Sequence, residues 1–333
     1  MSFTSSSQIV VQLDENSQVG DARRNAVRIA ELSALNETDQ GKVAIIATEL
    51  ANNLVRHGTK GEMIIRRCRS MHADGVEIIA FDRGPGMGDV QKCMEDGFST
   101  GGTSGTGLGA IKRLSTEFDV HSQRPSGTII VSRLLCSISD ASTRGTCGVI
   151  CIPAPGESLS GDNWSIAEKE EVISILLVDG LGHGPLAATA ADEAVRVFNT
   201  DPFREPGILI DAIHGSLRST RGAAVAIAHA NLNQRQIKYA GIGNISGTLI
   251  SGESSRGLFS HNGTVGLQIR KIQQFEYPWP EKALLIMHSD GLQGRWNLLN
   301  APALMNRDPA VIAGSLYRDH KRGRDDLTVA VVR

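Results

Sequence analysis

The sequence predicts an α+β protein made of two separately folded units. Its 333 residues are roughly twice the length of a common domain, and its 41% hydrophobic and 21% charged residues are close to globular averages. Helical and strand-like patterns alternate up to about residue 135, whereas strands dominate after about residue 145. The stretch between them, residues 137–145, is small and polar. We therefore expect a unit over residues 1–135, a linker over residues 136–144 and a second unit over residues 145–333.

The overall charge and the cysteines exclude several classes of protein. A formal net charge of -2 gives no electrostatic reason to expect a nucleic acid or an anionic membrane as partner. No apolar run approaches the ~20 residues that a membrane span needs, and the first residues lack the basic and apolar regions of a secretory signal. The five cysteines are odd in number and scattered, which is typical of a reducing compartment. We expect a cytoplasmic protein, and its oligomeric state stays open.

Hydrophobic periodicity and capping residues predict the elements of the first unit. Apolar residues at helical spacing, among them Ile46, Leu50 and Leu54, predict a core-facing helix that begins at a cap formed by Thr38 or Asp39. The expected helices cover residues 21–35, 38–57 and 110–118. The expected strands cover residues 8–13, 63–68, 76–81, 120–123 and 127–135, the last two as a hairpin. Together they predict helices on one face of a mixed sheet.

Two polar residues of the second predicted helix are candidates for phosphate chemistry. Glu49 and Asn53 are four residues apart, so both project from one face of the helix. An Asn oxygen can ligate Mg²⁺, which prefers oxygen ligands and also binds substrate phosphates. A Glu carboxylate can orient or deprotonate a nucleophile. The alternative for this pair alone is a solvated polar face.

A glycine-containing turn follows the strand over residues 76–81. Asp82 stands at the end of that strand, where its carboxylate could accept a hydrogen bond from the amine of adenine. Gly84 and Gly86 would let the backbone approach the base closely. The alternative for this turn alone is an ordinary Asp-Gly turn.

The glycine-rich stretch over residues 99–109 leads into the third predicted helix. Backbone N–H groups at a helix N-terminus, preceded by flexible glycines, bind anions such as phosphate. The stretch lacks the spacing and the lysine of a P-loop. Thr128, at the start of the last strand of this unit, could add a polar contact.

In this order the four motifs resemble the ATP-binding motifs of the GHKL superfamily, which includes gyrase, Hsp90, histidine kinases and MutL. The resemblance covers residues 8–135 and is closer to the compact anti-sigma-factor serine/threonine kinases of bacteria. It implies a Bergerat α/β sandwich that binds ATP with Mg²⁺, with Glu49 as catalytic base, Asn53 as Mg²⁺ ligand and Asp82 reading adenine. The residues that it implies for the pocket and its lid are Gly84, Gly86, Gly105, Thr106, Gly107, Leu108, Gly109 and Thr128.

The second unit is predicted to be a β-sandwich flanked by helices. The expected strands cover residues 148–153, 172–178, 223–230, 237–240, 247–250, 272–277, 283–288 and 327–332. The expected helices cover residues 185–198, 205–217 and 309–320.

Acidic residues of the second unit stand next to strand ends. They are Asp162, Asp179, Asp290 and the pair Asp325–Asp326, each near a glycine or a turn. Several carboxylates at one edge of a sandwich would repel one another unless cations lay between them. Ligands that are all oxygen favour Mg²⁺ or Mn²⁺, and two such ions can generate hydroxide for the hydrolysis of a phosphate monoester. The alternative for any single motif is an Asp-Gly turn.

This pattern resembles the metal-dependent PPM protein phosphatases, in particular their SpoIIE-like branch, over residues 145–333. The resemblance implies metal binding by Asp162, Asp179, the Gly180 carbonyl, Asp290 and Asp325. It favours Asp325 over Asp326 because the second position of that pair is often Asn in the superfamily. The stretch over residues 239–244 resembles a structural motif of the family, with Asn244 where His is common. His183 and His288 are either proton shuttles or packing residues, and no phosphate-binding arginine is evident near the first strand.

The two resemblances together imply a bifunctional partner-switching regulator of bacteria. One unit would phosphorylate Ser or Thr with ATP and Mg²⁺, and the other would dephosphorylate Ser or Thr with Mg²⁺ or Mn²⁺. The implied partners are STAS-domain or anti-sigma pathway proteins, with a sigma factor as a further candidate. The alternative is a phosphatase gated by a nucleotide-binding docking module that does not catalyse phosphate transfer.

Overall fold

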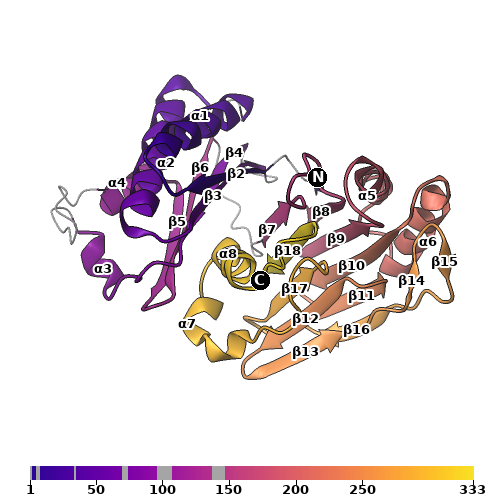
Figure 1. Ribbon diagram of the computed structural model, residues 1–333. Helices are drawn as coiled ribbons and strands as arrows, with labels where there is room; N and C mark the ends of the chain where they lie inside the picture. Colours follow the sequence, from indigo (N-terminus) through magenta and orange to yellow (C-terminus); the bar gives the residue numbers. More distant parts are fainter. Residues whose placement is uncertain (1, 5–7, 34, 70–73, 96–106, 137–146) are drawn as a thin grey trace. The chain divides into compact units, whose positions relative to one another are not determined.

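The computed structural model describes residues 2–4, 8–33, 35–69, 74–95, 107–136 and 147–333 (Figure 1). The chain divides into two compact units. The first unit contains Ser6–Ser142 and Asn306–Arg318, and the second contains Met1–Ser5, Thr143–Met305 and Asp319–Arg333. Both units mix helices with β-sheet, as predicted.

This division differs from the predicted continuous ranges 1–135 and 145–333 at two places. The short strand β1 (Ser2–Thr4) pairs with an edge strand of the second unit, and the helix α8 (Pro309–His320) lies largely in the first unit. Both placements depend on contacts between residues far apart in the chain, which a local sequence pattern does not reveal. Most of the predicted linker over residues 136–144 lies outside the described residues.

The first unit is built on a five-stranded sheet with the order β2-β3-β4-β6-β5. Its strands are β2 (Ile9–Leu13), β3 (Gly61–Arg69), β4 (Asp74–Phe81), β5 (Glu117–Gln123) and β6 (Gly127–Leu135). The prediction of a mixed sheet is wrong, because all described neighbours pair antiparallel. Two successive helices between β2 and β3 return the chain in the opposite direction, and β5 and β6 form the predicted hairpin.

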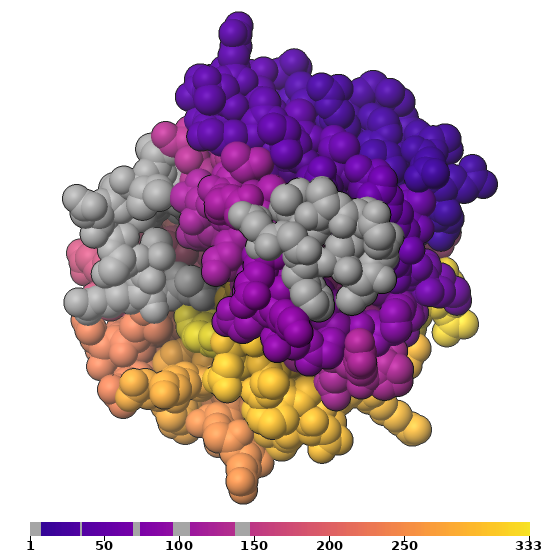
Figure 2. All heavy atoms as spheres, turned by 90° about the vertical axis from the view of Figure 1, so that its left-hand side faces the viewer, coloured from indigo at the N-terminus to yellow at the C-terminus, as the bar shows by residue number. Residues whose placement is uncertain are grey.

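Helices α1 (Ser17–Leu32) and α2 (Glu37–His57) pack on one face of this sheet, and the region of the chain that contains them forms the indigo surface at the top of Figure 2. Buried residues such as Leu50, Met63 and Ile78 make the core between helices and sheet. The N-cap of α2 is Asn36, whose side chain accepts a hydrogen bond from the Asp39 amide at 2.9 Å, rather than the predicted Thr38 or Asp39. Two shorter helices, α3 (Val90–Cys93) and α4 (Gly107–Leu114), follow β4.

Helix α8 packs on the opposite face of the sheet of the first unit. Tyr317 stacks edge-on against Phe81, with 5.4 Å between ring centroids. Gly314 allows close packing, because a Cβ there would lie 3.3 Å from Ile129 and 3.4 Å from Ile79. The prediction placed helices on one face only, whereas the structure covers both faces.

A buried ion-pair network holds the N-terminal end of α8. The guanidinium of Arg133 on β6 donates to both carboxylate oxygens of Asp308, at 2.7 and 2.8 Å, and to Glu77 at 2.6 Å. Asp308 also accepts a hydrogen bond from the Ala310 amide at 2.8 Å and so caps the helix. The same guanidinium also donates to Glu117 at 2.8 Å, so three anions offset the cost of removing this buried cation from water.

The second unit is a sandwich of two antiparallel sheets. One sheet contains β1, β8 (Asp162–Lys169), β9 (Val172–Gly180), β10 (Ala223–Asn231), β11 (Gln236–Ile242) and β16 (Phe275–Pro278), in that order. The other contains β13 (Ser254–Leu258), β12 (Ser246–Ser251), β17 (Leu284–His288), β18 (Leu327–Val332) and β7 (Cys147–Ile152), in that order. A small hairpin, β14 (Gly263–Thr264) and β15 (Gln268–Ile269), stands apart.

The core of the second unit lies between the two sheets and includes Trp164, Leu177, Tyr239 and Leu285. Helices α5 (Pro185–Phe198) and α6 (Pro206–Ser216) cover the outer face of the sheet that contains β9 and β10. Three short helical segments complete the unit, η1 (Leu217–Ser219), η2 (Leu298–Asn300) and α7 (Pro302–Met305). None of the helices in the described ranges has the length and apolar character needed to cross a membrane.

We predict that Asp308→Ala destabilises the first unit by about 1–3 kcal/mol, because Arg133 loses a bidentate partner and α8 loses its cap. Hydrogen exchange of the full chain should show faster exchange of the β6 amides. Asp211→Ala, on the exposed side of α6, is the matched control and should leave exchange unchanged. Unchanged β6 exchange in the Asp308 variant would show that the network does not hold the helix.

Candidate functional site

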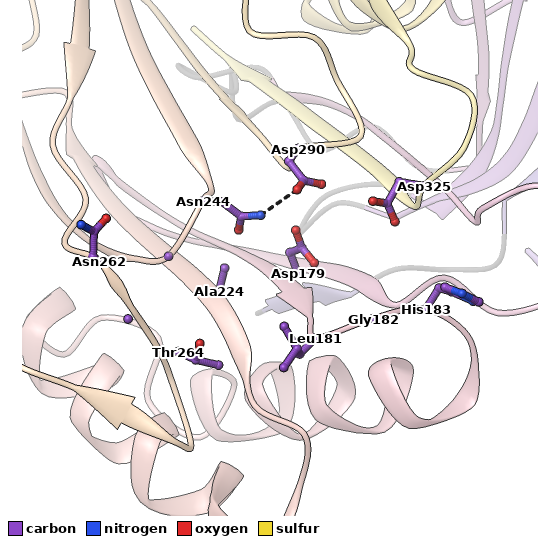
Figure 3. Close-up of a pocket in the computed structure, with 12 residues that line it drawn as sticks. Asp179, Leu181, Gly182, His183, Ala224, Asn244, Asn262, Thr264, Asp290 and Asp325 are labelled. Atoms are coloured by element: carbon purple, nitrogen blue, oxygen red, sulfur yellow. Dashed lines mark hydrogen bonds between the residues drawn. The ribbon is translucent and has the colours of Figure 1, made fainter.

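A cavity of about 510 Å³ opens where strand ends of the two sheets of the second unit meet (Figure 3). Asp179, Asp290 and Asp325 line it. Asp179 lies near the end of β9, Asp290 follows β17, and Asp325 precedes β18. Because β17 and β18 run antiparallel, the end of one lies beside the start of the other, so Asp290 and Asp325 come together.

The charges of Asp290 and Asp325 raise the proton affinity of the Asp179 carboxylate. The pKa of Asp179 is raised to about 7, first by burial and then by the charges of Asp290 and Asp325. Asn244 offsets part of this rise, because its side chain hydrogen-bonds Asp179 and its Nδ2 donates to Asp290 at 2.9 Å (Figure 3). The sequence motif that contains Asn244 resembles a structural motif, yet Asn244 lines the cavity.

Asp162 lies beside the cavity but does not line it. It pairs directly with Asp179 across β8 and β9, is only 3% exposed, and accepts a hydrogen bond from Ser289 at 2.6 Å. Burial, followed by the charge of Asp179, raises its pKa well above the usual range. As placed here, Asp162 is a buried neighbour of the cavity carboxylates.

The side chains of Asp325 and Asp326 lie in different environments. Asp325 lines the cavity and is exposed, whereas Asp326 is 3% exposed and accepts a hydrogen bond from the Ala154 amide at 2.8 Å. This arrangement agrees with the choice of Asp325 as the candidate metal ligand. Gly180 lies behind the cavity wall, where a Cβ would be 2.3 Å from the Ala187 carbonyl, so only glycine fits.

The cavity residues fit a hard divalent cation. Their donors are carboxylate and amide oxygens, which Mg²⁺ and Mn²⁺ prefer. Across the described ranges, no three His, Cys, Asp or Glu side chains form a group that could hold an ion alone. An ion in this cavity would therefore complete its coordination with water, as Mg²⁺ commonly does.

The two candidate histidines differ in their surroundings. His183 lines the cavity rim, and its Nδ1 lies 2.7 Å from Glu157 Oε1. In Figure 3 its ring points away from the three carboxylates. His288 is 3% exposed, its Nδ1 lies 2.8 Å from the Ser289 carbonyl, and burial lowers its pKa. These placements favour packing for His288.

Glu49 and Asn53 share one face of α2 in the first unit, as predicted from their spacing, and both are half-buried. The start of α4 lies close to both side chains. A Cβ added at Gly107 would lie 2.8 Å from Glu49 Oε2 and 3.9 Å from Asn53 Oδ1. The amides at this helix start therefore lie near both side chains, where a phosphate group could bind.

The remaining predicted residues around Glu49 divide into two groups. Leu108 and Gly109 are buried in the first turn of α4, where they contribute to packing. Gly105 and Thr106 lie outside the described residues.

Asp82 and its glycines form a compact turn at the end of β4. Asp82 is 8% exposed, and its Oδ1 accepts a hydrogen bond from the Gly84 amide at 2.6 Å. Burial raises the pKa of Asp82, although the Gly84 hydrogen bond opposes the rise. Gly86 has φ +67°, and a Cβ there would lie 2.7 Å from the Gln123 carbonyl. The Asp82 amide donates to the Thr128 carbonyl at 3.0 Å, so Thr128 lies beside the turn.

Two residues of this region escaped sequence reasoning. Gly127 has φ +83°, and a Cβ there would lie 2.1 Å from the Asp82 carbonyl, so this position requires glycine. Its signal was present in the Ser-Gly-Thr sequence at the start of β6. Arg318 donates from Nη1 to the Asp82 carbonyl at 3.0 Å. Because 236 residues separate Arg318 from Asp82, no local sequence pattern could indicate this contact.

Comparison with known families matches each part of the chain to a different family. Residues 13–134 match the model of the histidine kinase-like ATPase domain. Residues 169–333 match the model of stage II sporulation protein E, SpoIIE.

Two proteins of Bacillus subtilis strain 168 are similar to different parts of the chain. The serine/threonine-protein kinase RsbT is 38% identical over 109 residues, which cover 33% of this chain and 82% of RsbT. The phosphoserine phosphatase RsbX is 25% identical over 177 residues, which cover 52% of this chain and 86% of RsbX.

Solved structures support the fold of the second part. A chain from a study of the bacterial stressosome, described as a modular system adapted to control secondary messenger signaling, is 26% identical with a TM-score of 0.54. The match covers 57% of this chain and 100% of that chain. RsbX in complex with magnesium is 22% identical with a TM-score of 0.52, covering 57% of this chain and 96% of that chain.

We predict that Asp179→Asn stabilises the protein in the absence of metal by about 1–3 kcal/mol, because it removes one of the mutually repelling carboxylates. Mg²⁺ should stabilise the original protein and should stabilise the variant far less. Thermal unfolding in a chelator and in Mg²⁺ measures both effects, with Asp211→Asn as an exposed control. Equal Mg²⁺ stabilisation of both proteins would contradict metal binding at Asp179.

Proposed function

We infer the function of this chain from the family to which it belongs: the histidine kinase-like ATPases related to RsbT in its first unit, joined to a SpoIIE-type phosphatase in its second. The chain is therefore a partner-switching regulator with a kinase-like unit and a PPM phosphatase unit. We propose that the second unit removes phosphate from phosphoserine or phosphothreonine of a regulatory protein. We further propose that the first unit binds ATP with Mg²⁺ and phosphorylates Ser or Thr, and that the substrates are STAS-domain or anti-sigma pathway proteins.

The observation that carries the phosphatase proposal is the grouping of Asp179, Asp290 and Asp325 around one open cavity. These carboxylates would hold divalent cations such as Mg²⁺ or Mn²⁺. When bound, such cations supply positive charge to the phosphoryl oxygens and lower the pKa of a bound water. Asn244 fixes the orientation of Asp290 through its 2.9 Å hydrogen bond. Asp162, which accepts a hydrogen bond from Ser289, lies directly behind Asp179 on the neighbouring strand.

The rim of the cavity supports a protein substrate. Leu181 lines the cavity and is 52% exposed, and Leu186 at the start of α5 is 57% exposed. Leucines exposed at this rim could contact a protein that carries the phosphoryl group. The name of the relative RsbX, phosphoserine phosphatase, agrees with this substrate class.

The kinase proposal rests on the contact between α2 and α4. A carboxylate at Glu49 beside the start of α4 could accept the proton of a substrate hydroxyl, and Asn53 could bind Mg²⁺. The buried Asp82, with its turn of glycines, could accept a hydrogen bond from the adenine amine. A kinase and a phosphatase acting on the same serine would only consume ATP. The two units therefore act on different sites, or a partner selects one activity.

One observation favours a second function for the first unit, that of a nucleotide-dependent gate on the phosphatase without phosphate transfer. Arg318 at the end of α8 donates to the carbonyl of Asp82. After Arg318 the chain continues into the segment of the second unit that contains Asp325. A nucleotide bound at Asp82 would lie close to Arg318, and Arg318 is directly followed in the chain by the segment that contains Asp325.

We predict that the protein releases phosphate from a phosphoserine-containing STAS-domain protein when Mg²⁺ or Mn²⁺ is present. Asp290→Asn should lower the rate by about 100-fold or more, because it removes a carboxylate of the cation site. Phosphate release measures the rate, and Asp211→Asn should behave as the original protein. Retention of metal-dependent activity by the Asp290 variant would refute the site assignment.

We predict that the chain transfers labelled γ-phosphate from ATP to a partner protein, and that Glu49→Gln still binds ATP but transfers at least about 100-fold more slowly. Arg23→Gln, on α1, serves as the control on a neighbouring helix. If the original protein binds ATP without transfer and ATP changes the rate of phosphate release, the gate replaces the kinase proposal.

A further inference from the structure

We propose that Arg221 binds the phosphoryl group of the substrate at the rim of the cavity. The inference rests on the proposed phosphatase function and adds a substrate-binding residue to it. Sequence reasoning found no phosphate-binding arginine near the first strand of the second unit. The structure brings one to the cavity from a different place, the turn between η1 and β10.

The backbone of this turn is attached to the cavity wall. The Gly222 carbonyl accepts a hydrogen bond from the Leu181 amide at 3.0 Å, and Leu181 lines the cavity. Gly222 has φ +78°, and a Cβ there would lie 2.9 Å from Thr264 Cγ2, another residue of the cavity wall. The Gly222 amide donates to Thr220 Oγ1 at 3.0 Å. The position of Arg221 is therefore fixed between two stretches of the wall.

The side chain of Arg221 reaches the rim at Gly182. A Cβ at Gly182 would lie 3.3 Å from Arg221 Nη1, and Gly182 itself lines the cavity with φ +90°. A larger residue at position 182 would crowd the guanidinium. The absence of a side chain at Gly182 leaves room for the guanidinium beside the cavity entrance.

The negative charges around the cavity suggest what the Arg221 guanidinium does there. Asp179, Asp290 and Asp325 would repel a phosphate dianion, and no Lys or Arg is found among the described residues that line the cavity. Arg221 is exposed and has no ion-pair partner within the ranges that the structure describes. A guanidinium stays charged at all physiological pH values and offers paired N–H donors that match two phosphate oxygens. Arg221 can therefore offset the repulsion and orient the phosphate.

The experiment compares Arg221→Ala and Arg221→Lys with two arginine controls, all as full-length chains in Mg²⁺. Arg218→Ala changes an exposed arginine of η1, and Arg324→Ala changes the arginine next to Asp325. We measure KM and kcat with p-nitrophenyl phosphate and with a phosphoserine protein, and the inhibition constant of inorganic phosphate. Mg²⁺-dependent thermal stabilisation shows that each variant is folded and retains its cation site.

We expect Arg221→Ala to raise KM and the phosphate inhibition constant by about 10-fold or more, because a charge-assisted bidentate contact is lost. Its kcat should change less than its KM, and Arg221→Lys should recover part of the loss because it restores charge without the bidentate geometry. Unchanged constants in a folded Arg221→Ala, or the larger effect in Arg324→Ala, would overturn the inference while leaving the phosphatase proposal intact. Absence of activity in the original protein, with Mg²⁺ stabilisation present, would instead refute the phosphatase proposal.

Discussion

Mutual repulsion between carboxylates at one end of the β-sandwich is the constraint on which the second unit depends. Three aspartates line the cavity, and Asp162 and Asp326 lie buried behind it. Their neighbours oppose this repulsion with hydrogen bonds, from Asn244 to Asp290, from Ser289 to Asp162 and from the Ala154 amide to Asp326. Burial and this repulsion raise the pKa of Asp179 to about 7. Cations bound between the carboxylates would relieve the repulsion and would supply the chemistry proposed for phosphate hydrolysis. The same residues would therefore account for both the proposed metal binding and the proposed function.

The two units are not two continuous stretches of the chain joined end to end. The chain crosses between them after Ser5, Ser142, Met305 and Arg318, so each unit contains a segment from the other end of the sequence. Helix α8 covers the second face of the sheet of the first unit and is held at one end by Arg133 and Asp308. At its other end Arg318 contacts Asp82, the residue proposed to read adenine. The polypeptide therefore connects the two units at four points along its length.

The sequence predicted those features that depend on neighbouring residues in the chain. The spacing of Glu49 and Asn53 places them on one helix face, and the strand-end positions of Asp179, Asp290 and Asp325 let topology bring them together. It did not predict features that depend on distant contacts. Arg221 and Arg318 belong to no sequence motif. The role of Asn244 becomes evident only from its hydrogen bond to Asp290. The sequence predicted α8 as a helix of the second unit, whereas it lies largely in the first. The direction of strand pairing was predicted wrongly because a helix pair between β2 and β3 reverses the chain.

The central claim is that Asp179, Asp290 and Asp325 hold divalent cations where the substrate phosphate enters. Anomalous diffraction from crystals of the full chain grown with Mn²⁺ tests it most directly. The account predicts manganese peaks next to the Asp179 carboxylate and within coordination distance of Asp290 or Asp325, lost in the Asp179→Asn variant. Manganese bound elsewhere, or peaks that persist unchanged in that variant, would contradict the account.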